Sequence, residues 1–179
     1  MAGMAAPLTG WAALCAAGFA FRPVADGDLA FLQHLYRTVR WAELAPTQWP
    51  DETKRAFLDQ QFGFQRQHYE MAWAGAVFLL ILRDGEPIGR IYYDRAGGEL
   101  HLIEVSLLPE WRGQGLGTAL LRGLQQEVTE GRADRVVLNV TTTNPARRLY
   151  ERLGFVETRP DAEFPGVDLE LAWPALALS

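Results

Sequence analysis

Residues 100–121 read LHLIEVSLLPEWRGQGLGTALL, and this stretch decides the fold. Leu100 to Leu108 is mostly apolar and predicts a strand, Pro109 opens a turn, and a helix-forming run begins at Thr118 after the glycines. Glycine lacks a Cβ atom, so it allows tight turns and close approach of a ligand to the backbone. The first N–H groups of a helix have no intrahelical partner and favour an anion. The stretch therefore predicts a phosphate-binding loop, although a plain turn between strand and helix has a similar composition.

Two nucleotide-binding motifs are excluded here. A Walker loop needs Lys followed by Ser or Thr after its last glycine, whereas Thr118-Ala119 follow Gly117. A dinucleotide fingerprint needs Gly or Ala at its sixth position, which neither possible register supplies. The next predicted strand, 135–140, also lacks the acidic residue that the dinucleotide fold places at its end.

A different pattern does fit the loop. Residues 112–117 (RGQGLG) match R/Q-x-x-G-x-G/A, and further on come residues 138–140 (LNV), 144–146 (NPA) and 149–155 (LYERLGF). In these motifs, their order and their spacing, the chain from Leu100 onward resembles the GCN5-related N-acetyltransferases (the GNAT family). The N-terminal half is similar to that family only in its general layout.

The resemblance implies an α/β fold in which a mixed antiparallel and parallel sheet is flanked by helices. It also implies acetyl-CoA as the acyl donor. In the family, the strand before the loop splays from the next parallel strand, and the pantetheine arm lies in the opening. Carried over, this places the cofactor beside Leu107 and Leu108, with the Leu107 N–H facing the thioester carbonyl. The backbone amides expected to hold the pyrophosphate are those of Arg112, Gly113, Gln114, Gly115, Leu116, Gly117 and Thr118.

Two residues of the downstream motif are expected near the cofactor by the same resemblance. Tyr150 matches the tyrosine beside the sulfur, where a phenol can protonate a departing thiolate. Its alternative is an aromatic ring that only packs on the sheet. Asn144 matches the position whose side-chain amide contacts the cofactor arm, and its alternative is a helix cap before Pro145.

Glu104 is the candidate general base, since a carboxylate within an otherwise apolar strand is unusual. Burial raises the pKa of a carboxylate toward the range in which it can take a proton near neutral pH. The alternative is a salt-bridged or edge-facing Glu104. His101 points to the other face of the strand by parity, unless a bulge intervenes. No His/Cys cluster has metal-ligand spacing, so we expect no metal.

Composition limits the remaining possibilities. With 179 residues and 49% hydrophobic composition, the chain is expected to form one domain, residues 19–179, as a monomer or homodimer. A net charge of −5 without a basic run argues against nucleic acid. The single Cys15 suits a reducing cytoplasm. Residues 1–18 lack a basic start and an unbroken apolar span, so we expect neither a signal peptide nor a membrane anchor but a loose leader.

Hydrophobic periodicity and turn residues predict the remaining elements. Strands are expected at 19–24, 78–83, 87–93, 135–140, 155–158 and 167–173, and helices at 26–40, 51–69, 117–130 and 145–153. The acceptor is expected between the N-terminal helices and the sheet. Its aromatic wall is expected to come from Trp41, Trp49, Phe57, Phe62, Tyr69 and Trp73, which are also plausible core residues.

The function expected from these observations is transfer of an acetyl group from acetyl-CoA to a primary amine by direct attack in a ternary complex. The amine belongs to a small molecule or to a protein N-terminus or lysine. Three alternatives stay open: a longer acyl donor, a hydroxyl acceptor, or an acyl-CoA-binding sensor without catalysis.

Overall fold

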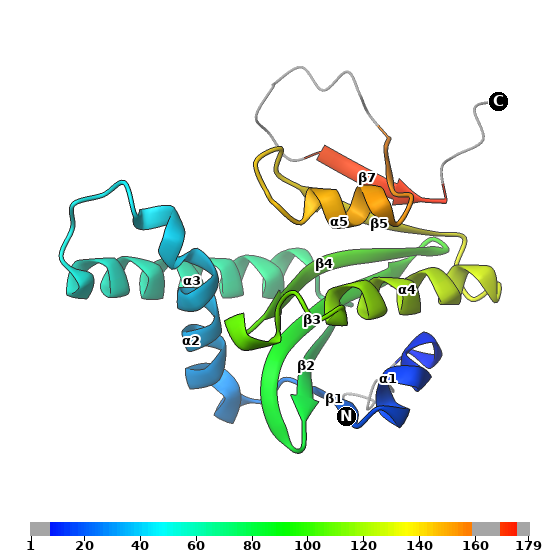
Figure 1. Cartoon of the computed structure of the whole chain (residues 1–179), viewed down its shortest axis with the longest axis horizontal. Helices are drawn as coiled ribbons and strands as arrows, with labels where there is room; N and C mark the ends of the chain where they lie inside the picture. Colours follow the sequence, from blue (N-terminus) through cyan, green and yellow to red (C-terminus); the bar gives the residue numbers. More distant parts are fainter. Residues whose placement is uncertain (1–7, 159–168, 175–179) are drawn as a thin grey trace.

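The computed structural model describes residues 8–158 and 169–174, which form a central sheet flanked by helices (Figure 1). The sheet has seven strands in the order β1-β2-β3-β4-β5-β7-β6. Strands β1 to β4 pair antiparallel, β4 and β5 pair parallel, and the last pairs are antiparallel again. This mixed sheet confirms the fold class predicted from the sequence.

The elements agree with the predicted ranges to within a few residues. The strands are β1 (Phe19–Pro23), β2 (Val77–Arg83), β3 (Glu86–Ala96), β4 (Glu99–Leu107), β5 (Arg135–Val140), β6 (Val156–Glu157) and β7 (Leu169–Trp173). The helices are α1 (Ala12–Ala16), α2 (Leu29–Arg40), α3 (Asp51–Ala72), α4 (Leu116–Thr129) and α5 (Arg147–Arg152). The predicted start of the last strand, at 167, lies outside the described residues.

The two middle strands of the sheet separate near their carboxyl ends. Pairing between β4 and β5 runs only from Glu99 opposite Arg135 to Leu102 opposite Leu138. Immediately beyond, β4 carries a bulge, because Tyr93 of β3 faces Leu102 whereas Tyr92 faces Glu104, leaving Ile103 as the extra residue. A bulge bends its strand and increases its twist. The bulge therefore coincides with the point at which β4 leaves β5.

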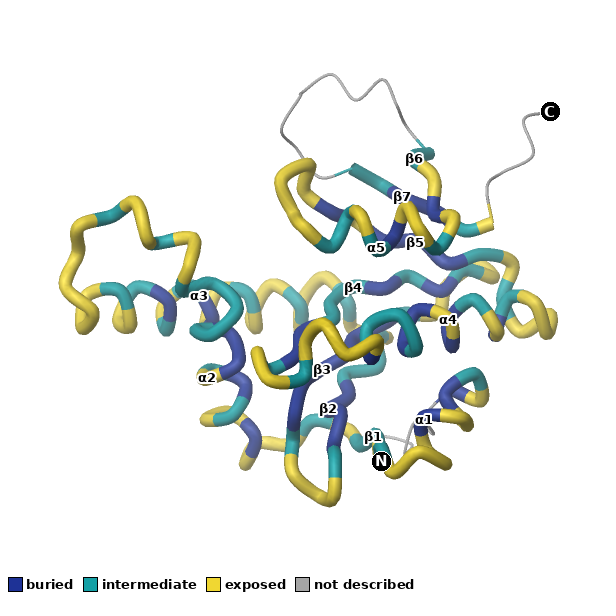
Figure 2. The backbone as a smooth tube through the Cα atoms, in the orientation of Figure 1, coloured by how far each residue is buried: buried dark blue, intermediate teal, exposed yellow. Residues whose placement is uncertain are grey.

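Helices cover both faces of the sheet, so β2 is buried on both sides (Figure 2). Leu79 and Ile81 belong to the larger core cluster, which includes Leu120 and Leu124 of α4. Leu80 and Leu82 belong to a second cluster with residues of α2 and α3, such as Leu32, Leu58 and Phe62. Burial on both faces explains why the sequence of β2 is an unbroken apolar run.

The prediction of a loose leader is wrong for residues 8–18. Thr9–Trp11 form a 3₁₀ turn that continues into α1, and Trp11 is fully buried, donating a hydrogen bond from its indole to the Leu120 carbonyl at 3.0 Å. Gly10 and Gly123 let the segment approach α4, since a Cβ on Gly123 would lie 2.2 Å from the Trp11 ring. Because this segment is rich in Ala, its sequence pattern did not indicate that Trp11 would be buried. Residues 1–7 lie outside the described part.

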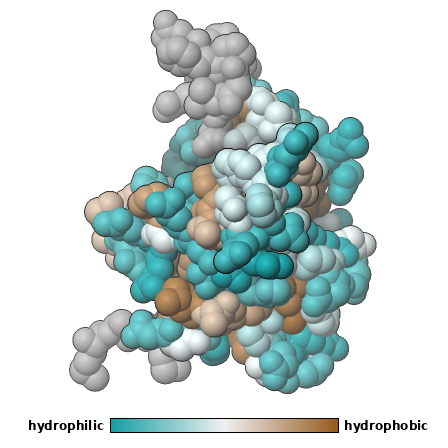
Figure 3. Space-filling model, turned by 90° about the vertical axis from the view of Figure 1, so that its left-hand side faces the viewer, coloured by the Kyte–Doolittle hydropathy of each residue, from teal (hydrophilic) through white to brown (hydrophobic). Residues whose placement is uncertain are grey.

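The outer side of α3 faces solvent and carries exposed apolar side chains. Phe64 is 56% exposed and Met71 is 71% exposed, both on this helix. Figure 3 views the molecule from the end where α2 and α3 lie, and its apolar side chains form separate patches among hydrophilic ones. Within residues 8–158 and 169–174, no helix combines the length and the apolar character that crossing a membrane requires.

Candidate active site

The loop between β4 and α4 presents free backbone N–H groups at the start of a helix. Gly113 and Gly115 have φ angles of 70° and 83°, a region that disfavours other residues. A Cβ at either would meet no atom within 4 Å, so conformation rather than space requires glycine there. Gly115 precedes α4 and its carbonyl accepts from the Ala119 N–H at 2.9 Å. The first amides of α4 therefore face outward without helical partners.

Side chains brace this loop. Arg112 donates from Nε to the Leu107 carbonyl at 2.8 Å, and Gln114 donates to the Glu110 carbonyl. Gly117 has an ordinary helical conformation, and a Cβ there would lie 3.4 Å from the Leu149 side chain of α5. The glycines and braces hold the loop in a concave shape that suits an anion such as pyrophosphate.

The opening between β4 and β5 exposes one edge of β4. The Leu108 N–H donates to the Ile88 carbonyl of β3 at 2.9 Å. N–H groups alternate between the two edges of a strand, so the Leu107 N–H points to the edge that β5 has left. This is the orientation expected for a donor to a carbonyl in the opening. Leu108 can reach a ligand there only through its carbonyl or side chain.

Glu104 lies on the face of the sheet that α3 covers, in a polar rather than an apolar setting. Its oxygens accept hydrogen bonds from Ser106 and from the Tyr69 hydroxyl, the latter at 3.1 Å. Arg90 Nη2 lies 3.6 Å from its Oε1. The prediction of apolar surroundings for Glu104 is therefore wrong, because neighbouring strands and α3 supply polar groups. The side chain remains 18% exposed and so is open to a ligand.

The bulge at Ile103 reverses the expected relation between His101 and Glu104. Both side chains face α3, since His101 packs against Trp73 with ring centroids 4.7 Å apart and Glu104 accepts from Tyr69. Burial lowers the pKa of His101, so it is neutral at neutral pH. His101 lies three residues before Glu104, within the part of β4 that still pairs with β5, and therefore outside the opening.

Tyr150 projects from α5 and is buried, with 7% of its surface exposed. Its ring packs edge-on against Phe155 with centroids 5.9 Å apart. Burial, followed by the negative charge of Glu104, raises the pKa of Tyr150 to about 12. The phenol therefore keeps its proton at neutral pH.

Asn144 forms a turn before α5 and is not the helix cap that the sequence offered as its alternative, because the N-cap residue of α5 is Ala146. Its Oδ1 accepts from the Ala146 N–H at 2.9 Å and its carbonyl accepts from the Arg147 N–H at 3.0 Å. This turn explains why α5 begins at Arg147 rather than at Pro145. The side-chain amide of Asn144 still points a donor group outward on an exposed loop, compatible with a second role toward the cofactor arm.

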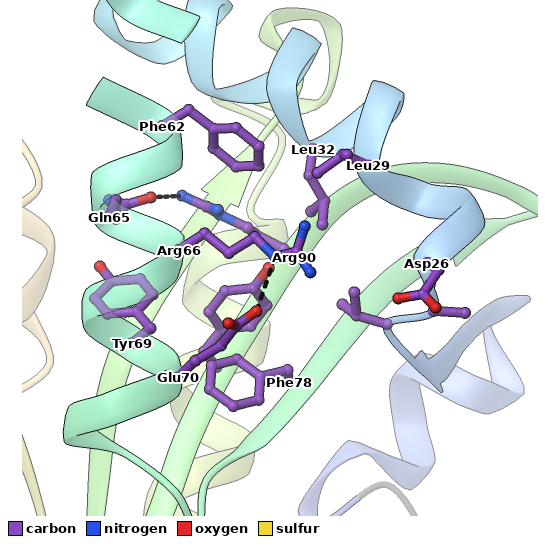
Figure 4. Close-up of a pocket in the computed structure, with 13 residues that line it drawn as sticks. Asp26, Leu29, Leu32, Phe62, Gln65, Arg66, Tyr69, Glu70, Phe78 and Arg90 are labelled. Atoms are coloured by element: carbon purple, nitrogen blue, oxygen red, sulfur yellow. Dashed lines mark hydrogen bonds and ion pairs between the residues drawn. The ribbon is translucent and has the colours of Figure 1, made fainter. Parts of the chain in front are cut away.

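A cavity of about 230 Å³ opens on the face covered by α2 and α3 (Figure 4). Tyr69, Arg90 and Tyr92 belong to its wall, and the first two also contact Glu104. The apolar part of the wall includes Leu29, Leu32, Phe62 and Phe78. Of the six aromatics predicted to form an acceptor wall, Phe62 and Tyr69 line this cavity, whereas Trp41 and Phe57 pack in the second core cluster and Trp49 packs on Phe57.

Arg90, Ser106 and Tyr69 were not singled out as a polar cluster from the sequence. Arg90 is only 3% exposed in the middle of β3, and its Nη2 donates to Gln65 Oε1 at 2.9 Å. A signal was present, because Arg90 interrupts an apolar strand in the same way as Glu104. Only the register of β3 against β4, with Arg90 opposite Ser106, brings the groups together.

Comparison with known proteins agrees with this geometry. The family model described as "Acetyltransferase (GNAT) family" matches residues 35–155. A crystal structure of PaiA N-acetyltransferase from Thermoplasma acidophilum, in complex with coenzyme A, matches 86% of this chain and 97% of that chain, with a TM-score of 0.61 and 17% identity. The ribosomal-protein-S18-alanine N-acetyltransferase from Escherichia coli matches with a TM-score of 0.55 over 86% of this chain and 92% of that one, at 19% identity.

Curated relatives match a shorter part of the chain. A mycothiol acetyltransferase of Corynebacterium aurimucosum is 48% identical over 62 residues, 34% of this chain and 19% of that protein. A [ribosomal protein bS18]-alanine N-acetyltransferase of Haemophilus influenzae is 32% identical over 79 residues, 44% of this chain and 54% of that protein. The aligned parts thus span from about a fifth to about half of these relatives. The chain belongs to the GNAT acetyltransferase family.

Proposed function

We propose that this protein transfers an acetyl group from acetyl-CoA to a primary amine by direct attack in a ternary complex. The observation that carries the proposal is the opening between β4 and β5, which begins beyond Leu102. Glu104 lies on β4 beyond the last paired residue, the glycine-rich loop follows β4, and α5 with Tyr150 follows β5. The neighbour solved with coenzyme A supports an acyl-CoA as the donor. The names of the relatives support an amine as the acceptor.

The protein's own groups have distinct tasks in this reaction. The loop amides from Gly113 to Thr118 hold the pyrophosphate and so fix the donor relative to β4. The Arg112 N–H, predicted from the sequence to take part, already donates to the Pro109 carbonyl at 3.1 Å. The Leu107 N–H donates to the carbonyl oxygen as negative charge develops on it. Such preorganised donors commonly contribute a factor of about 10² to 10³ in rate.

Proton transfer has an acceptor and a donor group on two elements. Glu104 receives the proton that the amine must lose, directly or through water, because its side chain is held by Tyr69 and Ser106 and is still partly exposed. Tyr150 protonates the leaving sulfur, since its phenol is neutral at neutral pH. After one turnover Glu104 carries the proton of the amine and Tyr150 is a phenolate, so proton exchange with water must restore both groups before the next turnover.

The test is turnover with acetyl-CoA, followed by thiol release, against a panel of small amines and peptides with free N-termini. The proposal expects thiol release that requires an amine and matches the amount of acetylated product. Binding of acetyl-CoA without turnover of any amine would favour the sensor instead. Faster turnover with longer acyl-CoA donors would show that the transferred group is a longer acyl group, and the rest of the proposal would stand.

A further inference from the structure

Arg90 is a buried cation whose hydrogen-bonding capacity is not used up. Its side chain is 4% exposed, and among the described residues only Nη2 donates a hydrogen bond of normal geometry, to Gln65. Its Nε is buried without a partner within that part of the chain. A guanidinium has five N–H donors, and a donor left without a partner in the interior destabilises the fold.

The nearest carboxylate does not supply hydrogen-bond acceptors for the remaining N–H groups of Arg90. Glu104 lies 3.6 Å from Arg90, beyond hydrogen-bond distance, and its oxygens already accept from Ser106 and Tyr69. The ring of Tyr92 lies under the guanidinium, 5.1 Å from its carbon. Burial alone would lower the pKa of Arg90, but Glu104 and the neighbouring tyrosines outweigh it and raise the pKa, so the charge persists.

Arg90 belongs to the wall of the cavity on the α2 and α3 face, and the close-up shows its hydrogen bond to Gln65 near Arg66 (Figure 4). Arg66 is a different kind of group, since it is 48% exposed and paired with Glu70 at 2.8 Å. Among the described residues, the buried arginine of the cavity wall thus keeps N–H groups without a partner, whereas the exposed arginine is already paired.

We propose that the acceptor is an α-amino acid with an apolar side chain, whose carboxylate is bound by Arg90. This rests on the proposed function, because Glu104 then takes the proton of the α-amine. In an α-amino acid the amine and the carboxylate are separated by one carbon, which suits two protein groups as close as Glu104 and Arg90. Planar guanidinium and carboxylate groups form strong, charge-assisted hydrogen bonds.

The rest of the cavity is compatible with such a ligand. Leu29, Leu32, Phe62 and Phe78 supply an apolar wall for a side chain. The volume of about 230 Å³ corresponds to roughly seven or eight water molecules at about 30 Å³ each. A single amino acid fits a space of that order, and Arg90 provides a charged group for its carboxylate end.

The test uses three acceptors with the same ring and amine: phenylalanine, phenylalaninamide and phenethylamine, with a leucine series in parallel. The proposal expects kcat/KM, corrected for the fraction of neutral amine, to be about ten- to a hundredfold higher for the acid than for the analogue without a carbonyl. Equal values for acid and phenethylamine overturn the proposal but leave acetyl transfer standing. Equal values for acid and amide also overturn it, in favour of a neutral carbonyl such as that of a peptide N-terminus. Absence of turnover with every amine overturns the proposed function itself.

Substitution of each arginine then tests which of the two causes the preference for a carboxylate. Arg90→Gln is expected to lose the preference for the acid, and Arg66→Gln, a cavity arginine already paired with Glu70, is expected to keep it. The reverse result overturns the assignment to Arg90. Because Arg90→Gln alters a buried site, stabilisation of the unaltered protein by 3-phenylpropionate in the presence of CoA provides a second readout. A rise in melting temperature with 3-phenylpropionate and none with 3-phenylpropanol supports the proposal, and equal shifts contradict it.

Discussion

At the scale of single residues, the proposed movement of protons depends on two side chains from different elements. Tyr150 is a buried phenol on α5, and Glu104 is a partly exposed carboxylate on β4. Burial raises the pKa of the Tyr150 phenol and keeps it neutral, whereas Glu104 accepts hydrogen bonds from Tyr69 and Ser106. The pair therefore suits an acid and a base in one reaction.

Replacing Tyr150 with Phe is expected to lower kcat by about ten- to a thousandfold while leaving acetyl-CoA affinity nearly unchanged. The ring is retained, so only proton donation to the sulfur is lost. Because the raised pKa of about 12 keeps Tyr150 protonated below that pH, no loss of activity through this group is expected between pH 7 and 10. Steady-state kinetics and calorimetric titration measure both quantities. Tyr93→Phe, at a phenol that is 2% exposed near Arg95 and Glu127, is the control, and equal losses in the two variants would make Tyr150 a packing residue.

Glu104→Gln keeps the size of the side chain but removes its ability to accept a proton. We expect kcat/KM to fall about a hundredfold and the acid limb of its pH profile to flatten. Ser106→Ala, which removes one hydrogen-bond donor and keeps the carboxylate, is expected to have a smaller effect and to keep that limb. A Gln variant with an unchanged pH profile would move the base to another group, such as His101 or a bound water.

At the scale of elements, the helix start after β4 and the bulge within β4 together build the site. The first follows from local sequence, since the glycine spacing and the helix-forming run indicate a loop that ends in free amides. The second depends on pairing between strands that are distant in the chain. One extra residue at Ile103 turns Glu104 toward Arg90 and Tyr69 and ends the contact of β4 with β5.

Gly115→Asp is expected to abolish the rise in melting temperature that acetyl-CoA produces. The new side chain would be strained at a φ of 83° and would place negative charge where the phosphates bind. Gly131→Asp is a matched control, because Gly131 has a φ of 72° and open space around its Cβ position beyond the other end of the same helix. Thermal shift with and without acetyl-CoA separates the two effects. If both variants keep the ligand-induced shift, the phosphates bind elsewhere.

The sequence predicted the helices and strands and the position of the glycine-rich loop well, because these are encoded in short motifs and in periodicity. The strands, the main helices and the glycine-rich loop agree with the structure. The polar cluster around Glu104 was missed, since its members come from β3, β4 and α3 and meet only through tertiary packing. The face of His101 was likewise set by a bulge that no local pattern indicates.

At the scale of the whole molecule, the N-terminal segment is fastened to the rest of the fold through one buried carboxylate. Glu127 of α4 is 1% exposed and accepts from Thr9 Oγ1 at 2.7 Å and from the Gly10 N–H at 2.8 Å. Arg95 and Arg132 pair with the same carboxylate. Burial alone would raise the pKa of Glu127, but these hydrogen bonds outweigh it and lower the pKa to about 2.

Stability is therefore expected to fall in acid. A carboxylate whose pKa is lower in the folded than in the unfolded state stabilises the fold above its unfolded pKa of 4.5, and this contribution is lost as the pH falls toward about 2. Glu127→Gln should cost on the order of 2 kcal/mol at pH 7, allowing for the exposure of both arginines, and little at pH 2. Urea unfolding at several pH values measures this. Glu86→Gln, at an exposed residue of the β2–β3 turn, is the control, and equal pH dependence in both variants would contradict the role of Glu127.

A crystal structure with coenzyme A bound is the most direct test of the central claim, that the opening between β4 and β5 is where donor and acceptor meet. Pyrophosphate is expected on the amides of residues 113–118, the pantetheine arm beside β4 beyond Leu102, and the sulfur within hydrogen-bond distance of the Tyr150 hydroxyl. Coenzyme A bound at any other face of the sheet, or a sulfur remote from both Tyr150 and Glu104, would contradict it.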